Sequence, residues 1–235
     1  MQSINKTSII VTAYDETALH RRITSACLGN INRFTNRDEY ELILVDQNAT
    51  NNKTRWMDLN TRHHFIDIDK HIKLDNGIGQ SAAFNLGYKN SNPDYGNIIF
   101  IHNDVLVNEG WLSILRSCIE GKENAIIMPH QGPSNREHIL QMYSEKEPRG
   151  NDDAGLIMMS KETFKKTGGW DERFSIVCQA AAFYTRFPNS YSCTGKCLIT
   201  HITAINMYDD EDMAREFPLF DELKLTGKGK DINYL

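Results

Sequence analysis

The stretch IIFIHNDVLVNEGWL, residues 98–112, holds two apolar runs that are separated by the polar residues HND. The first run, IIFI, has no polar position, which is typical of a strand covered on both faces of a sheet. The polar residues come where such a strand would end, and Trp111 and Leu115 beyond them have the spacing of an amphipathic helix. This stretch therefore predicts a buried strand, a polar turn and a helix, a pattern typical of α/β folds.

The same alternation extends in both directions along the chain. Strand-length runs rich in Ile, Val and Leu recur as TSIIVTAY, YELILVD, AIIMPH, AGLIMMS and CLITHITA. Residues 81–90 predict a helix with Ser81 as its candidate N-cap. An earlier helix is predicted by an apolar stripe of Leu19, Ile23, Ala26, Cys27, Ile31 and Phe34. We expect an α/β sandwich whose mostly parallel sheet is flanked by helices, with ligands beyond the carboxyl ends of the strands.

Composition and charge narrow the class of protein. The 235 residues suit one large domain or two small ones, and a net charge of −5 argues against broad nucleic-acid binding. The five cysteines are scattered, so we expect free thiols rather than a disulfide framework. The first residues lack the pattern of a secretion signal, and no apolar window reaches the roughly 20 residues that span a bilayer. We expect a soluble, cytoplasmic protein without a membrane span.

Acidic residues follow three of the expected strands, in VTAYDE, LVDQNAT and FIHNDVLV. One such residue usually caps the next helix, but three at one edge of a sheet favour a shared polar pocket. In the third segment, the two-residue period of a strand places His102 and Asp104 on one side and Asn103 on the other. Asp104 is a candidate ligand for Mg²⁺ or Mn²⁺, which accept oxygen ligands. His102, taken alone, is better interpreted as a core histidine.

Together these segments resemble the family 2 glycosyltransferases, which are inverting enzymes of the GT-A fold. SIIVTAYDE is similar to the opening strand of that family, and ELILVDQNATNNKT is similar to its second strand. NGIGQSAAFNLGYKNS is close to an Asn-x-Gly-x-x-x-Ala-x-Asn-x-Gly segment, and IIFIHNDVLVNEGWL fits the strand that carries the acidic metal motif. AGLIMMSKETFKKTGGWDERF is similar to the segment before the catalytic helix, and the matches keep their order from about residue 8 to residue 201.

The resemblance implies a single GT-A domain over residues 1–235, with a nucleotide-binding part at about 1–107 and an acceptor and catalytic part at about 108–235. It implies transfer of a sugar from a nucleotide-sugar donor to a hydroxyl of a glycan or other acceptor, with inversion and with Mn²⁺ or Mg²⁺ as cofactor. The metal would be held by Asp104, with His201 as a second ligand, while His102 replaces the first Asp of the usual motif. The donor-binding residues implied are Thr12, Tyr14, Asp15, Asp46, Asn76, Gly79, Asn85, Asn103 and Trp170. Trp170 is the candidate for stacking on a sugar ring, whereas the helical spacing of Trp111 favours the core.

One element of the family pattern is missing. After GGWDERF, the family carries an acidic motif in which one carboxylate serves as general base. The matching positions here are Gln179, Ala180 and Ala182, so no carboxylate remains. The chain is then a naturally inactive relative, an enzyme whose base comes from elsewhere, or an engineered alanine variant of an active enzyme. The retained Phe183, Tyr184 and Arg186 favour the engineered variant, and the nearest acids for the second explanation are Asp152, Asp153 and Asp171.

Two other functions compete with an active transferase. The first is a non-catalytic module that binds a nucleotide sugar or a glycan and regulates a partner. The second is a nucleotidyltransferase, which shares a nucleotide-binding α/β architecture. This second function is weaker, because VTAYDETALHRR contains arginines but lacks the glycine-rich signature that it requires.

Overall fold

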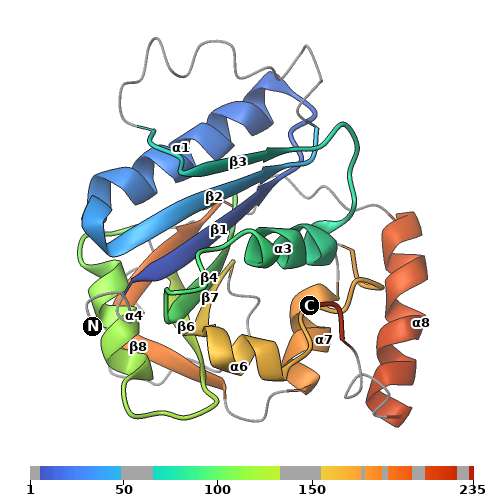
Figure 1. Cartoon of the computed structure of the whole chain (residues 1–235). Helices are drawn as coiled ribbons and strands as arrows, with labels where there is room; N and C mark the ends of the chain where they lie inside the picture. Colours follow the sequence, from blue (N-terminus) through green and yellow to red (C-terminus); the bar gives the residue numbers. More distant parts are fainter. Residues whose placement is uncertain are drawn as a thin grey trace.

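The protein is built around one mixed β-sheet, seen in a computed structural model that describes residues 6–48, 66–132, 155–175, 178–186, 190–202, 210–226 and 233–235 (Figure 1). The strands are β1 (Thr7–Ala13), β2 (Tyr40–Asp46), β3 (Lys70–Lys73), β4 (Asn97–His102), β5 (Val105–Val107), β6 (Ile126–Gly132), β7 (Leu156–Ser160) and β8 (Ser190–His201). The helices are α1 (Ala18–Phe34), the 3-10 turn η2 (Arg37–Glu39), α3 (Gln80–Lys89), α4 (Trp111–Ile119), α6 (Lys161–Lys166), α7 (Gln179–Thr185) and α8 (Asp210–Thr226).

Within the described residues the strand order is β3-β2-β1-β4-β7-β6-β8-β5. Strands β3, β2, β1 and β4 run parallel to one another, β7 is antiparallel to β4 and β6, and β8 is parallel to β6. Within residues 98–112, strand β4 ends at His102 and a turn follows. The next strand, β5, pairs antiparallel with β8. The predicted α/β architecture with a mostly parallel sheet flanked by helices is confirmed.

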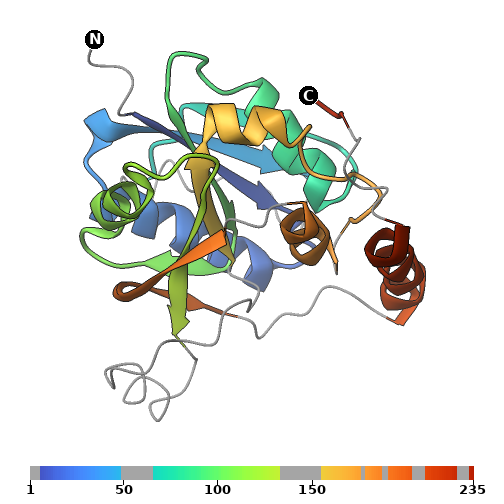
Figure 2. The ribbon, with the colours of Figure 1, turned by 90° about the horizontal axis from the view of Figure 1, so that it is seen from below.

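Alternate residues of the central strands point to opposite faces of the sheet, and both faces are covered. Ile9 and Val11 pack in a cluster with residues of α1 and α4, whereas Ile10 and Ile43 pack in a second cluster with residues of α3 and α6. Figure 2 shows the resulting layers, with α3 and α6 on one side of the sheet and α1 and α4 on the other. Burial on both faces explains why these strands are apolar without alternation. Trp111 is buried in the first cluster, as its helical spacing predicted.

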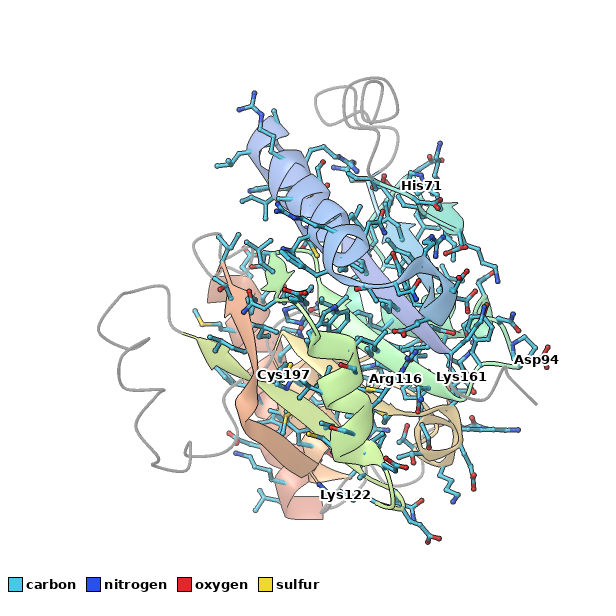
Figure 3. The ribbon with its side chains drawn as sticks, turned by 90° about the vertical axis from the view of Figure 1, so that its left-hand side faces the viewer. His71, Asp94, Arg116, Lys122, Lys161 and Cys197 are labelled. Carbon is cyan, nitrogen blue, oxygen red and sulfur yellow. The ribbon has the colours of Figure 1, made fainter. Side chains whose placement is uncertain are left out.

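An arginine side chain of helix α4 also forms hydrogen bonds with residues at the amino end of the sheet. Arg116, which Figure 3 labels, donates from Nη2 to Thr7 Oγ1 at 3.0 Å and to the Glu39 carbonyl at 2.7 Å. Burial lowers the pKa of Arg116, and Glu39 opposes that effect. In the described part of the chain, no helix is long and apolar enough to cross a membrane.

The buried face of α1 differs from the predicted apolar stripe. Leu19 is 58% exposed, whereas Arg21 and Thr24 are buried. The prediction for Leu19 was wrong because the first turns of α1 lie over acidic strand ends rather than over apolar core. Buried carboxylates require polar partners, and these turns supply them.

The start of α3 also differs from the prediction. The N-cap position is Gly79 rather than Ser81, and it makes no side-chain capping bond. Ser81 is fully buried, and its hydroxyl donates to the carbonyl of Phe174. The serine therefore joins two distant segments instead of capping its own helix.

Candidate metal and donor site

The polar ends of three strands meet at one edge of the sheet. Strands β1, β2 and β4 are parallel and adjacent, so Asp15, Asp46 and Asn103 follow neighbouring carboxyl ends. The antiparallel pairing of β5 with β8 sets His201 opposite Val105 and thus beside Asp104. The sequence predicted that these segments would share an edge, and the strand pairing confirms it.

A cluster of three ligand-type side chains lies at this edge. His102, Asp104 and His201 each offer one atom, and these atoms all lie within 4.8 Å of one another. His201 Nε2 is 3.0 Å from Asp104 Oδ1, and the two histidine rings are 5.4 Å apart between centroids. Two imidazole nitrogens and a carboxylate fit a divalent cation with several open positions. The core interpretation of His102 was wrong, since its half-buried side chain belongs to this cluster.

A glycine that the sequence analysis missed makes room for the cluster. A Cβ atom on Gly155 would stand 2.6 Å from Val105 Cγ2 and 3.0 Å from His201 Cε1. The Gly155 carbonyl also accepts a hydrogen bond from the His102 amide at 2.7 Å. Any side chain at this position would push the His201 ring out of place. The sequence offered only a weak signal, a glycine one residue before an apolar strand.

The two acidic residues predicted to bind the donor are both fully buried and share one arginine. Arg21 Nε lies 3.1 Å from Asp15 Oδ2, and Arg21 Nη1 lies 3.1 Å from Asp46 Oδ2. His71, on β3 and labelled in Figure 3, places Nε2 at 3.2 Å from the same Asp46 oxygen. Burial raises the pKa of Asp15, and the Arg21 charge opposes that rise. Both carboxylates therefore face Arg21 instead of the surface.

The same network reaches the turn that carries Asp104. Asn103 Nδ2 donates to Thr24 Oγ1 at 2.7 Å and lies 3.3 Å from Asp15 Oδ1. Thr24 Oγ1 in turn donates to Asp15 Oδ1 at 2.8 Å. Thr24 of helix α1 thus holds the turn at Asn103, which is followed by Asp104. Arg21 and Thr24 were missed because their polarity suggested a solvent-facing side of the helix.

We expect Arg21→Met to destabilise the fold by about 3–5 kcal/mol, because it leaves two buried carboxylates without their shared cation. The control is Arg22→Met on the exposed face of α1, which should change stability by less than about 0.5 kcal/mol. Urea unfolding measures both. The pKa of Asp15 is raised in the folded protein, so this acid takes up a proton more easily there than in the unfolded chain. The loss of stability in Arg21→Met should therefore be smaller near pH 5 than at pH 8. Equal losses for the two variants would contradict the bridging role.

An exposed rim lies beside the buried acids. Tyr14 is 38% exposed, and its ring covers Gly77, where a Cβ would stand 3.1 Å from Tyr14 Cε2. Asn76 is exposed, and Gly79 has a φ of +84°, which favours glycine. Thr12, by contrast, is only 4% exposed, at the end of β1. Of the predicted donor-binding residues, Tyr14 and Asn76 are exposed, and Gly79 and Asn103 are partly exposed.

Two predicted donor-binding residues are turned into the protein. Asn85 accepts from the Trp170 amide at 2.8 Å and donates to the Trp170 carbonyl at 2.9 Å. Trp170 is 3% exposed, and its ring centroid lies 4.4 Å from that of Phe183 and 5.2 Å from that of Phe84. The prediction that Trp170 stacks on a sugar was wrong, because the ring fills an aromatic core.

The positions of the missing acids lie on α7. Gln179 and Ala180 are buried, at 4% and 8% exposure, and Ala182 is completely buried. The exposed alanine of the run is Ala181. Gln179 Nε2 donates to Gln80 Oε1 at 2.6 Å, which joins α7 to the start of α3.

Asp171, a candidate for a base from elsewhere, is poorly suited to that role. It is 2% exposed, and both of its oxygens bond to Arg173, at 2.9 and 2.6 Å. Burial alone would raise the pKa of Asp171, but the Arg173 hydrogen bonds and charge hold the pKa below its usual value. Asp152 and Asp153 lie outside the described residues.

Comparisons with known proteins agree on the fold. GalNAc-T7, solved with UDP, GalNAc and Mn²⁺, superposes with a TM-score of 0.60 at 12% identity, covering 86% of this chain and 44% of that one. TarS residues 1–349 from S. aureus gives 0.66 at 14% identity, with coverage of 97% and 67%. Mannosyltransferase PcManGT from Pyrobaculum calidifontis, solved with GDP-Man and Mn²⁺, gives 0.64 at 14% identity, with coverage of 86% and 58%. The chain thus spans between 44% and 67% of the length of these GT-A glycosyltransferases.

The sequence itself places the chain in a family. A search of curated protein sequences finds no match. The model of glycosyl transferase family 2 matches residues 8–191, which include the strand ends at Asp15, Asp46 and Asp104 and the alanines of α7. This match covers most of the chain and ends within β8. The chain belongs to glycosyl transferase family 2.

Proposed function

We propose that this protein is a metal-dependent, inverting glycosyltransferase that moves a hexose from a nucleotide-sugar donor to a hydroxyl of a glycan or other acceptor. The observation that carries the proposal is the cluster of His102, Asp104 and His201 at the strand edge where Asp15 and Asp46 also lie. Family membership supports sugar transfer in general. In the proposed division, residues 1–107 bind the donor and residues 108–235 provide the acceptor side.

The ligand set favours Mn²⁺ over Mg²⁺, because two of its three members are imidazoles and Mg²⁺ prefers oxygen. A cation bound there would offset the negative charge on the diphosphate leaving group. His102, Asp104 and His201 would hold it. Two structural relatives were solved with Mn²⁺ beside UDP or GDP-Man.

The remaining residues would shape the donor pocket. Tyr14, Asn76 and Gly79 form the accessible rim, so we assign them to contacts with the nucleotide. Asp15 and Asp46 act through Arg21 and the turn at Asn103, since their carboxylates are buried. Thr12, Asn85 and Trp170 support this arrangement from within the protein.

The missing base makes the chain slow or silent in transfer, and we propose that it is an alanine variant of an active enzyme. Arg186 supports this proposal. Burial lowers the pKa of Arg186 to about 10, and its Nη1 donates to the Thr167 carbonyl at 3.0 Å. Its Nε and Nη2 are buried and make no hydrogen bond in the described part. A carboxylate at position 182 would precede Arg186 by four residues, the spacing of helical acid–arginine pairs.

Calorimetry with Mn²⁺ and a panel of UDP-, GDP- and dTDP-sugars tests the function. We expect one nucleotide to bind in the presence of Mn²⁺ and to bind far more weakly after chelation with EDTA, because the diphosphate contacts depend on the cation. The corresponding nucleoside diphosphates, which lack the sugar, serve as a second panel. Comparing the affinities of the two panels separates recognition of the nucleotide from recognition of the sugar. The absence of binding for every donor would overturn the proposal.

A non-catalytic binding module is the second candidate. The observation that favours it is the absence of a carboxylate from the buried first turn of α7, combined with an intact metal cluster. Such a module would bind the same nucleotide. Only a gain of transfer on restoring the acids separates the two functions.

A further inference from the structure

Helix α8 lies beyond the part of the chain that the family model matches. The match ends at residue 191, whereas α8 begins at residue 210 and stands at the side of the molecule next to α7 (Figure 1). The contact is apolar on both sides, formed by Leu219, Phe220 and Leu223 of α8 with Phe174, Cys178 and Ala182. The helix therefore packs directly on the segment where the family carries its catalytic acids.

A charged residue lies within this apolar contact. Glu216 has no exposed surface, and its Oε1 accepts from the Ser175 amide at 2.8 Å and from the Ser175 hydroxyl at 2.7 Å. Its Oε2 accepts from the Cys178 amide at 3.0 Å. Arg215 Nη2 lies 3.3 Å from Oε1. Hydrogen bonds to a buried carboxylate are strong and costly to break, so the residues that lead into α7 are fixed against α8.

Ser175 meets a second functional segment from its other side. Its carbonyl accepts from the Gln80 amide at 2.7 Å. Its Cβ is so close to Gly79 that a Cβ there would stand 2.9 Å away. The hydrogen bond from Gln179 Nε2 to Gln80 Oε1 is a second link to the start of α3. Ser175 thus lies between Glu216 and the start of α3 at Gly79 and Gln80.

We propose that Glu216 is a positioning residue for the transferase site. Its carboxylate, acting through Ser175 and Cys178, sets where residue 180 stands relative to Gly79 and Gln80. Helix α8 is therefore part of the site, although it lies outside the family match. The catalytic consequence rests on the proposed function, while the geometric part rests only on the contacts of Glu216.

Hydrogen exchange on the full chain tests the geometric part. Glu216→Gln keeps the size of the side chain but replaces one accepting oxygen with an amide NH₂ group, which donates hydrogen bonds and cannot accept them. Amides from Ser175 through the first turn of α7, and the Gln80 amide, should exchange at least about tenfold faster, with β1 and β4 unchanged. The control is Asp221→Asn on the exposed side of α8, where the acid pairs with Lys224 at 2.7 Å. Exchange like that of the control, or equal acceleration throughout the sheet, would overturn the proposal.

Kinetics test the catalytic part, in the background of Ala180→Asp with Ala182→Asp. Glu216→Gln should lower kcat about tenfold, because misplacement of a catalytic group slows the reaction. The affinity for Mn²⁺ should not change, because the metal cluster lies on β4, β8 and the turn between β4 and β5. An unchanged kcat would contradict the positioning role. If the background variant transfers no sugar, the proposed function fails, and the exchange result alone decides whether Glu216 fixes the segment.

Discussion

If the proposed function is right, placing acids at positions 180 and 182, as Ala180→Asp with Ala182→Asp, should increase sugar transfer by about 10²–10⁴-fold, the usual contribution of a general base. The chain as it stands holds no carboxylate in the first turn of α7 that can take the proton of an acceptor hydroxyl. The expected gain appears in kcat, while the affinity for the nucleotide stays constant, because the donor rim and metal cluster are untouched. Released nucleoside diphosphate, measured with Mn²⁺ and a panel of hydroxyl acceptors, reports the rate.

Ala181→Asp is the control, since it adds a carboxylate to the same helix but on its exposed face. It should leave the rate at the level of the starting protein. A double variant that binds the donor yet transfers nothing would favour the non-catalytic module. A gain in Ala181→Asp equal to that of the double variant would contradict the assignment of the base position.

Asp104→Asn should weaken Mn²⁺ binding by at least about 100-fold, because it removes the charged member of the ligand set and leaves two neutral imidazoles. Electron paramagnetic resonance of free Mn²⁺ measures the affinity without any need for catalysis.

Asp94→Asn is the control for the metal experiment. Asp94, which Figure 3 labels, is an exposed acid that precedes β4. Asp104, by contrast, follows β4. The control should bind Mn²⁺ like the unchanged protein. If Asp104→Asn retained full affinity, the cation would be held by other residues and the proposed donor site would lose its basis.

The fold was predictable because hydrophobic runs report burial directly. Strands such as β1 and β4 are covered on both faces, so each has an unbroken apolar centre, IIV in β1 and IIFI in β4, that carries the signal locally. The parallel order of β2, β1 and β4 then brings their polar ends to one edge. Which polar side chains face one another at that edge depends on pairings between distant segments, and no local pattern contains that information.

The failures follow from that limit. We expected Trp170 to stack on a ligand, but the fold packs its ring against Phe84 and Phe183. In the sequence, a tryptophan at an exposed site cannot be distinguished from a tryptophan in the core. Glu216 follows the charged stretch DDEDMAR in the sequence, yet it is buried against two backbone amides. In both cases the environment is made by residues far away in the sequence.

The sequence by itself determined the α/β architecture, the edge of the sheet where the polar strand ends meet, and the absence of acids at positions 180 and 182. Only the tertiary structure decided that His102 joins the metal cluster, that Arg21 joins Asp15 to Asp46, and that α8 holds α7 through Glu216. The physical reason is the distance along the sequence over which each feature is set. The burial of a strand follows from its own residues, whereas the partner of a buried charge depends on the packing of the whole chain.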